Sequence, residues 1–193
     1  MPRTYTLERT QLIPLPLRDV FPFFSDAKNL EAITPPFLQF KILSPAPIVL
    51  QAGTLIDYRI RLLGIPMFWR TQIESFDPPL RFSDTQIRGP YRLWHHTHEF
   101  LETAEGTLMT DLVRYQMPFG PLGTLAHALW TRRTLERIFD FRFEKVAELL
   151  GAGPRVGTAG KASSPMSRYL AASCIVHELG AHRSCDDELA RRS

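Results

Sequence analysis

The chain has 193 residues, of which 44% are hydrophobic and 22% charged, with a formal net charge of +3. This composition is typical of one globular domain with an extension, and the small net charge excludes the basic patch of a nucleic-acid-binding protein. Because no apolar run approaches the roughly 20 residues of a membrane helix and the first residues lack the apolar core of a signal peptide, we predict a cytoplasmic protein without a transmembrane segment.

The first 43 residues predict a strand, two short helices and a second strand. Residues 5–13 alternate loosely between polar and apolar side chains, which indicates a strand. From Leu17 onward, apolar residues recur at the spacing of a short amphipathic helix, which Pro22 should shorten or kink. Ser25 or Asp26 can cap a second short helix over 27–33, and a strand is predicted over 37–43.

Residues 54–88 predict the start of an antiparallel meander. The segments 54–63, 67–76 and 80–88 alternate between apolar and polar residues and are separated by turns containing glycine or proline. Tyr58 and Trp69 lie on the apolar faces of the first two segments. Pro90 excludes the common type I′ hairpin turn after the third segment, so the spacing leaves open whether Asp84 shares a face with the side chains of the next strand.

The hairpin formed by 91–101 and 107–116 is the most informative stretch. Its strands carry one shared face, with these members: Trp94, His96, His98, Phe100, Met109, Asp111, Val113 and Tyr115. If Glu102 and Thr107 close the turn, His98 is opposite Asp111, whereas a register shifted by two pairs His96 with Asp111. His95 points to the opposite face and is expected at the surface.

Two imidazoles and a carboxylate on an otherwise apolar face need an explanation, because burying an unpaired carboxylate is costly. One explanation is a cavity, since small-molecule sites are apolar pockets with a few converging polar groups. The other is a histidine–aspartate bond that joins two strands inside a packed core. The sequence leaves both open.

A long helix is predicted over 121–150, starting after Gly120 and ending at Gly151. It carries two apolar stripes whose centres differ by about a third of a turn. The stripes are Leu122, Leu125, Ala126, Leu129 and Trp130, and then Leu135, Ile138, Phe139, Val146, Leu149 and Leu150. Either the first half closes over a cavity mouth, or the helix is kinked or drifts in register.

Residues 1–151 are therefore predicted to form one domain and residues 152–193 a flexible tail with a weak helix near 167–179. In the tail, Cys174, His177, His182 and Cys185 are residue types that bind zinc, but their central gap is much shorter than in usual zinc fingers. They are a weak alternative to our prediction of no metal site. No nucleotide-binding or nucleophile motif occurs, so no cofactor is predicted.

Four segments carry a family resemblance: NLEAITPP (29–36), GTLIDYRIRLLGIPMFW (53–69), RFSDTQIRGPYRLWHHTHEF (81–100) and GTLMTDLVRYQMPFGPLG (106–123). The chain resembles the SRPBCC superfamily of START and Bet v 1-like proteins, which includes polyketide cyclase/dehydratase and coenzyme-Q-binding START-type proteins. It looks most like a bacterial subgroup labelled cell-division-inhibitor-like. The resemblance implies an α+β helix-grip fold: a curved antiparallel sheet of about seven strands, two short helices after the first strand and a long C-terminal helix.

The resemblance also implies a cavity between the sheet and the long helix. Its expected lining is Tyr58, Trp69, Trp94, His96, His98, Asp111 and Tyr115. Our leading interpretation is a protein that binds a small hydrophobic ligand such as a polyketide, quinone or lipid. We favour this binding function over catalysis. The alternatives are a cyclase or dehydratase in which Asp111 polarises His96 or His98, and an interaction module linked to cell division. The ligand and the oligomeric state are not determined by the sequence.

Overall fold

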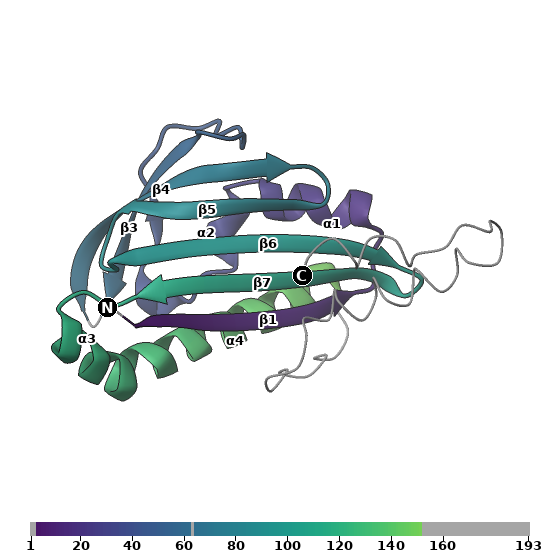
Figure 1. Cartoon of the computed structure of the whole chain (residues 1–193). Helices are drawn as coiled ribbons and strands as arrows, with labels where there is room; N and C mark the ends of the chain where they lie inside the picture. Colours follow the sequence, from purple (N-terminus) through teal and green to yellow (C-terminus); the bar gives the residue numbers. More distant parts are fainter. Residues whose placement is uncertain (1–2, 63, 152–193) are drawn as a thin grey trace, which may run out of the picture. The chain divides into compact units, whose positions relative to one another are not determined.

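The described part of the chain is built on one seven-stranded antiparallel sheet with the order β1-β7-β6-β5-β4-β3-β2 (Figure 1). The computed structural model describes residues 3–62 and 64–151, so the predicted tail, its weak helix and its four cysteine and histidine residues lie outside the described residues. Two short helices follow the first strand, and a long helix is the last described element. This architecture confirms the predicted α+β helix-grip fold.

The elements follow one another in the predicted order. They are β1 (Thr4–Ile13), α1 (Leu17–Ser25), α2 (Asn29–Ala32), a 3₁₀ turn η1 (Pro36–Leu38), β2 (Lys41–Ile42), β3 (Leu55–Leu62), β4 (Ile65–Asp77), β5 (Arg81–Arg88), β6 (Leu93–Thr103), β7 (Gly106–Gln116), α3 (Gly120–Ala126), a π turn η2 (His127–Thr131) and α4 (Arg132–Leu150).

The segment after β1 is less regular than predicted. Helix α1 contains Pro22, which is exposed, while the predicted apolar stripe from Leu17 to Phe24 is buried. Helix α2 is shorter than the predicted 27–33, and Asp26 accepts a hydrogen bond from the backbone N–H of Lys28 at 3.0 Å. The predicted strand over 37–43 is reduced to β2, because Pro36–Leu38 forms a 3₁₀ turn instead.

The register of the sheet determines which polar groups meet. In the β6–β7 hairpin, His98 is opposite Asp111, as one of the two predicted registers requires. Between β5 and β6, Asp84 is opposite His96 and Phe82 is opposite His98. This pairing answers the question left open at Gly89-Pro90: Asp84 shares the histidine face.

The C-terminal helix consists of two parts with different packing. In α4, Leu135, Phe139 and Val146 are buried against the sheet. In the first part, which comprises α3 and the π turn, the side chains of Leu122 and Trp130 are 73% and 58% exposed. The first half of the helix therefore does not close over the cavity mouth. The two apolar stripes are instead explained by a shift in register, because the π turn contains more residues per turn than an α-helix.

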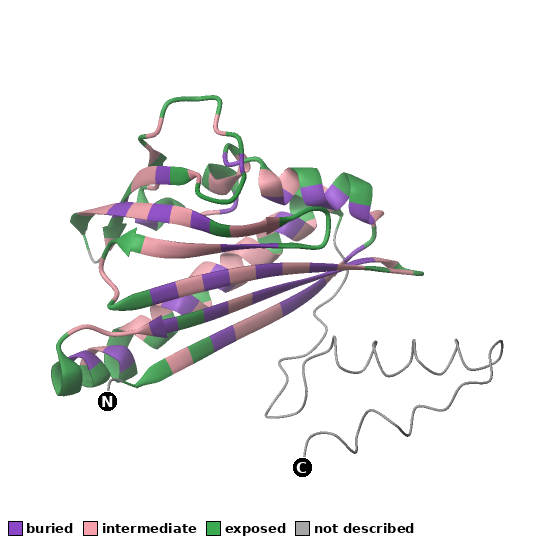
Figure 2. Cartoon of the chain, turned by 45° about the horizontal axis from the view of Figure 1, so that its top comes forward, coloured by how far each residue is buried: buried purple, intermediate pink, exposed green. Residues whose placement is uncertain are grey.

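The core lies on the face of the sheet that α1 and α4 cover. Buried residues alternate with less buried ones along β6, as Figure 2 shows by colour, whereas residues 107–111 of β7 are all buried. One cluster joins α1 to the far end of α4 through Phe21, Phe100 and Val146, and another surrounds Trp69, Trp94 and Tyr115 near the start of α4. The two clusters leave the histidine face between them.

Gly106 closes the β6–β7 hairpin in a conformation that favours glycine, with φ of +131°. A Cβ at this position would collide with the carbonyl oxygen of Ile13 in the neighbouring strand. We expect Gly106→Ala to destabilise the protein by about 3 kcal/mol, the sum of an unfavourable φ and a backbone clash. Gly53→Ala is the matched control: φ is also positive, at +89°, but the surrounding space is open, so a loss of about 1 kcal/mol is expected. Urea unfolding measures both, and equal losses would contradict the clash.

Candidate functional site

A cavity of about 180 Å³ lies beside the histidine face of the sheet. Its wall is formed by side chains from α1, the α2 region, four strands and α4. The lining includes Phe24, Ala27, Leu30, Ile33, Ile56, Tyr58, Ile60, Trp69, Thr71, Ile73, Phe82, Asp84, Tyr91, Trp94, His96, His98, Leu135, Ile138, Phe139 and Arg142. Asp26, which is exposed, also borders it, so the cavity reaches the surface near α2.

One end of the cavity is aromatic. The rings of Tyr58 and Trp69 are stacked with centroids 5.7 Å apart, and Trp94 meets Trp69 edge to face at 5.3 Å. Trp69 donates its indole N–H to the hydroxyl of Thr71 at 3.1 Å, and the Tyr58 hydroxyl lies 3.1 Å from the same oxygen. These bonds fix two large rings, and the wall they form is rigid and largely apolar.

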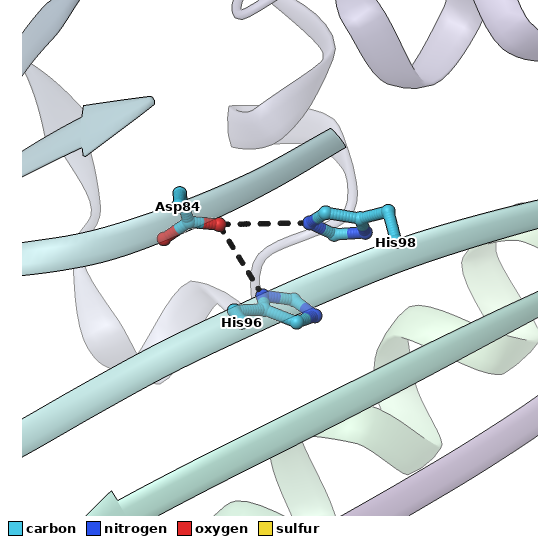
Figure 3. Close-up of side chains that lie close together, drawn as sticks. All are labelled: Asp84, His96 and His98. Carbon is cyan, nitrogen blue, oxygen red and sulfur yellow. Dashed lines mark ion pairs between the residues drawn. The ribbon is translucent and has the colours of Figure 1, made fainter. Parts of the chain in front are cut away.

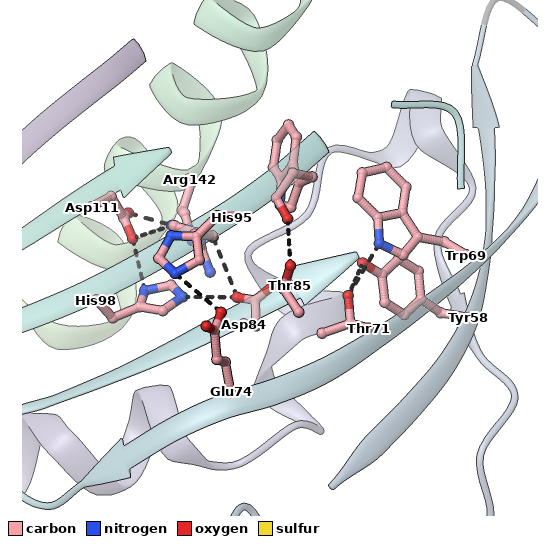
Figure 4. A network of polar contacts seen from close by, with 12 residues as sticks. Tyr58, Trp69, Thr71, Glu74, Asp84, Thr85, His95, His98, Asp111 and Arg142 are labelled. Carbon is pink, nitrogen blue, oxygen red and sulfur yellow. Dashed lines mark hydrogen bonds and ion pairs between the residues drawn. The ribbon is translucent and has the colours of Figure 1, made fainter. Parts of the chain in front are cut away.

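The opposite end is polar. Asp111 Oδ1 lies 2.8 Å from Nε2 of His96 and 2.7 Å from Nδ1 of His98, although the second contact is off the direction of a good hydrogen bond. Arg142 reaches from α4 to within 3.8 Å of Asp111 Oδ2 (Figure 4). On the other side of the imidazoles, Asp84 Oδ2 lies 3.7 Å from His96 and 3.6 Å from His98.

The protonation of this cluster follows from its burial and charges. Burial raises the pKa of Asp111, but the Arg142, His98 and His96 charges outweigh it and hold that pKa well below its usual range. Burial also opposes charge on His98, yet Asp111 and Asp84 raise its pKa. For His96, burial and the neighbouring His98 lower the pKa. Asp111 is therefore ionised, and of the two imidazoles His98 accepts a positive charge more readily than His96.

Five of the seven predicted lining residues border the cavity: Tyr58, Trp69, Trp94, His96 and His98. The other two do not. Asp111 lies behind the histidines as their partner, and the Tyr115 hydroxyl is 2.9 Å from Nε2 of His127 in the adjoining core.

Asp84 and Arg142 were not predicted as site residues. Asp84 lies two strand positions beyond Phe82, and only the pairing across Gly89-Pro90 places it opposite His96. Arg142 lies one helical turn after Ile138 and so follows a cavity-lining residue of the second apolar stripe. That spacing is a signal that could have identified it.

His95 lies where the alternation of the strand puts it, on the opposite face from the cavity. Its Nε2 is 3.2 Å from the exposed Glu74 (Figure 4). It is therefore not part of the buried cluster.

The arrangement can bind an apolar molecule and present polar groups to one end of it. His96, with a nearby ionised carboxylate, can also accept or donate a proton there. Asp84, His96 and His98 together are the described residues whose donor atoms are close enough to hold a metal ion.

A family model described as "polyketide cyclase / dehydrase and lipid transport" matches residues 13–142. The chain belongs to this family. The matched range contains β2 to β7, both short helices, and α4 up to Arg142. Membership supports the binding of hydrophobic ligands in general and does not identify one. No curated protein matches the chain in sequence.

Several solved structures share the fold at low identity. Protein Ms6760 from Mycobacterium smegmatis is 18% identical, with a TM-score of 0.56 over 76% of this chain and 90% of its own. The protein TTHA0849 from Thermus thermophilus is 22% identical, with a TM-score of 0.53 over 76% and 99%. The major latex-like protein 151 of Panax ginseng is 13% identical, with a TM-score of 0.53 over 76% and 97%. At these identities the likeness shows the fold alone.

Among the described helices of this family member, none is long and apolar enough to cross a membrane.

Replacing Asp111 by Asn tests the buried cluster. The variant keeps the shape but removes the negative charge that compensates Arg142 and His98, so we expect a loss of about 3 kcal/mol or more in the free energy of unfolding. Asp57→Asn is the matched control, because Asp57 pairs with Arg70 at 2.6 Å on the half-exposed side of the sheet, where ion pairs contribute little. Urea unfolding of both variants at neutral pH measures the difference. Similar stabilities would show that the Asp111 charge is not needed.

The buried tyrosines predict a loss of stability at alkaline pH. Burial, with a contribution from the neighbouring Tyr5, raises the pKa of Tyr115 to about 12, and burial also raises the pKa of Tyr58 and Tyr91. Because the folded protein holds these protons more tightly, the contribution is complete below the ordinary tyrosine pKa of about 10 and is lost as the pH rises toward 12. We expect urea unfolding at about pH 11 to show lower stability than at about pH 9, and Tyr115→Phe to reduce this difference. A pH-independent stability would contradict the prediction.

Proposed function

We propose that the protein binds a small hydrophobic ligand carrying at least one ring and one oxygen. The observation that supports this most directly is the cavity itself, which joins an aromatic end containing Tyr58, Trp69 and Trp94 to a polar end containing His96 and His98. The aromatic end would contact the ring, and an imidazole would orient a carbonyl or hydroxyl oxygen.

The cavity volume limits the ligand. An engineered cavity of about 150 Å³ accommodates benzene, so a volume of about 180 Å³ suits a molecule of one or two rings. A longer polyketide, quinone or lipid would need the cavity to widen. Burying about 250 Å² of apolar ligand surface at about 25 cal/mol/Å² provides about 6 kcal/mol, which corresponds to a Kd of tens of micromolar.

A cavity-filling substitution tests this function with 2-naphthol, a two-ring probe with one hydroxyl. Ile60 lines the cavity, so Ile60→Phe should occupy ligand space and weaken binding at least about 10-fold. Ile87→Phe is the control, since Ile87 is 54% exposed on β5. Isothermal titration calorimetry measures the affinity. Absence of binding by the folded wild-type protein, or equal binding by the two variants, would reject the proposal.

Tryptophan fluorescence locates the bound probe. Trp69 and Trp94 border the cavity, whereas Trp130 is exposed on the π turn. Energy transfer to the probe should therefore persist in Trp130→Phe and weaken in Trp69→Phe. The reverse pattern would place the probe at the exposed end of the helix.

A second function, acid–base catalysis, is favoured by the 2.8 Å contact between His96 Nε2 and Asp111 beside the cavity. Asp111 would hold the imidazole while it transfers a proton near a ligand carbonyl, as a cyclisation or dehydration requires. The two functions are distinguished by His96→Gln, which would abolish turnover of a substrate but reduce binding of 2-naphthol only modestly.

A further inference from the structure

Three metal-ligating side chains converge at the wall of the cavity (Figure 3). Asp84 on β5 is directly opposite His96 on β6, and His98 is two residues further along the same face. One donor atom from each lies within 4.8 Å of the others: Asp84 Oδ2, His96 Nδ1 and His98 Nε2. The strand period of two and the cross-strand pairing are sufficient to bring them together.

The spacing of these atoms is close to that of a metal site. The carboxylate oxygen is 3.7 Å from His96 and 3.6 Å from His98, which is longer than a hydrogen bond. In a tetrahedral site with bonds of about 2.0–2.1 Å, neighbouring ligand atoms lie about 3.3 Å apart. The two edges from the carboxylate to the imidazoles are therefore within a few tenths of an ångström of this value, and the edge between the two imidazole nitrogens is no longer than 4.8 Å.

The far side of the imidazoles supports the same conclusion. Their other nitrogens, His96 Nε2 and His98 Nδ1, lie 2.8 and 2.7 Å from Asp111 Oδ1. A metal-binding histidine usually donates its second N–H to a carboxylate, which fixes the ring and directs the other nitrogen's lone pair at the metal. His96 is aligned for this bond, whereas His98 Nδ1 is at bonding distance from Asp111 but off its direction. With both rings turned to donate to Asp111, two lone pairs and the Asp84 carboxylate would face one another, an arrangement that a cation would stabilise.

The surroundings leave room for a fourth ligand. All three side chains border the cavity, so the remaining position opens into it, as in metal sites that bind a water or a substrate. Asp84 and Asp111 are only partly balanced by Arg142, so a divalent ion would leave this cluster with one excess positive charge. A hydroxide or an anionic ligand oxygen at the open position would neutralise it.

We propose that Asp84, His96 and His98 bind one divalent transition-metal ion of the zinc or ferrous class, with an open position facing the cavity. Two imidazoles and one carboxylate suit Zn²⁺, Fe²⁺ and Co²⁺ better than Mg²⁺ or Ca²⁺, which prefer oxygen ligands. The metal site does not rest on hydrophobic-ligand binding, and its test uses no organic ligand, so either proposal can fail alone.

The experiment is a titration of full-length, untagged protein with Co²⁺ after removal of metals by a chelator. Visible absorption bands of four- or five-coordinate cobalt should appear and saturate at one ion per chain, and added Zn²⁺ should displace them. Asp84→Asn and His98→Gln should each weaken cobalt binding by about 100-fold or more, and Asp111→Asn by about 10- to 100-fold through loss of its support for the rings.

Two controls locate the ion. His95→Gln changes a histidine on the same strand that faces Glu74 instead of the cavity, so its cobalt spectrum and affinity should equal those of the wild type. Cys174→Ser combined with Cys185→Ser tests the alternative ligands of the tail and should also leave the spectrum unchanged. Circular dichroism verifies that each variant is folded.

Three results would overturn the proposal. The first is the absence of cobalt bands in folded wild-type protein. The second is unchanged cobalt binding in folded Asp84→Asn and His98→Gln. The third is loss of the bands in the double cysteine variant, which would assign the metal to the tail.

Discussion

The burial of charge on an apolar sheet face is the constraint on which the rest of the structure depends. Asp111 is 4% exposed, and its charge is offset by His98 on the neighbouring strand and by Arg142 on α4. Asp111 and these two partners come from β7, β6 and α4, so the cluster forms only when the sheet and the helix are both in place. Moving β7 by one residue would turn Asp111 to the other face and leave Arg142 without its counter-charge. The polar cluster therefore helps to specify the register of β7, in addition to hydrophobic packing.

The same constraint bears on the cavity. Charged groups and imidazoles cannot pack against apolar atoms without losing hydrogen bonds. The rings of Tyr58 and Trp69 are held by Thr71 and so do not move readily into the space beside the histidines. A space between a rigid aromatic end and a polar end is a physically reasonable result. Fold membership does not select among carriers, receptors and enzymes, since function depends on the site residues. In this chain the candidate site residues are two imidazoles paired with Asp111, the second carboxylate of Asp84 beside them, and two tryptophans.

Much of this fold could be predicted from patterns in the sequence. The alternation in the last hairpin allows two registers, because facing residues have a constant index sum, and the structure has the one that places His98 opposite Asp111. The stripe in α1 is also evident. What could not be predicted depends on non-local geometry: the pairing across Gly89-Pro90 that adds Asp84, and the reach of Arg142 from another element.

The remaining differences between the predicted and the observed structure concern β2 and Tyr115. Pro36 favours a 3₁₀ turn over the predicted strand, so β2 has two residues. Tyr115 shares the predicted face but contacts His127, because the chain after β7 returns over that end of the sheet. Alternation assigns a side chain to a face and does not say whether a cavity or another side chain meets it there.

The π turn at His127–Thr131 separates two halves of the final helix that differ in their packing. Beyond it, Leu135 and Phe139 belong to the cavity wall and tolerate little change in volume. On its other side, Leu122 and Leu125 are exposed and line no part of the cavity. A substitution in the first half therefore changes an apolar surface that faces solvent, whereas one at Leu135 or Phe139 changes the volume of the cavity.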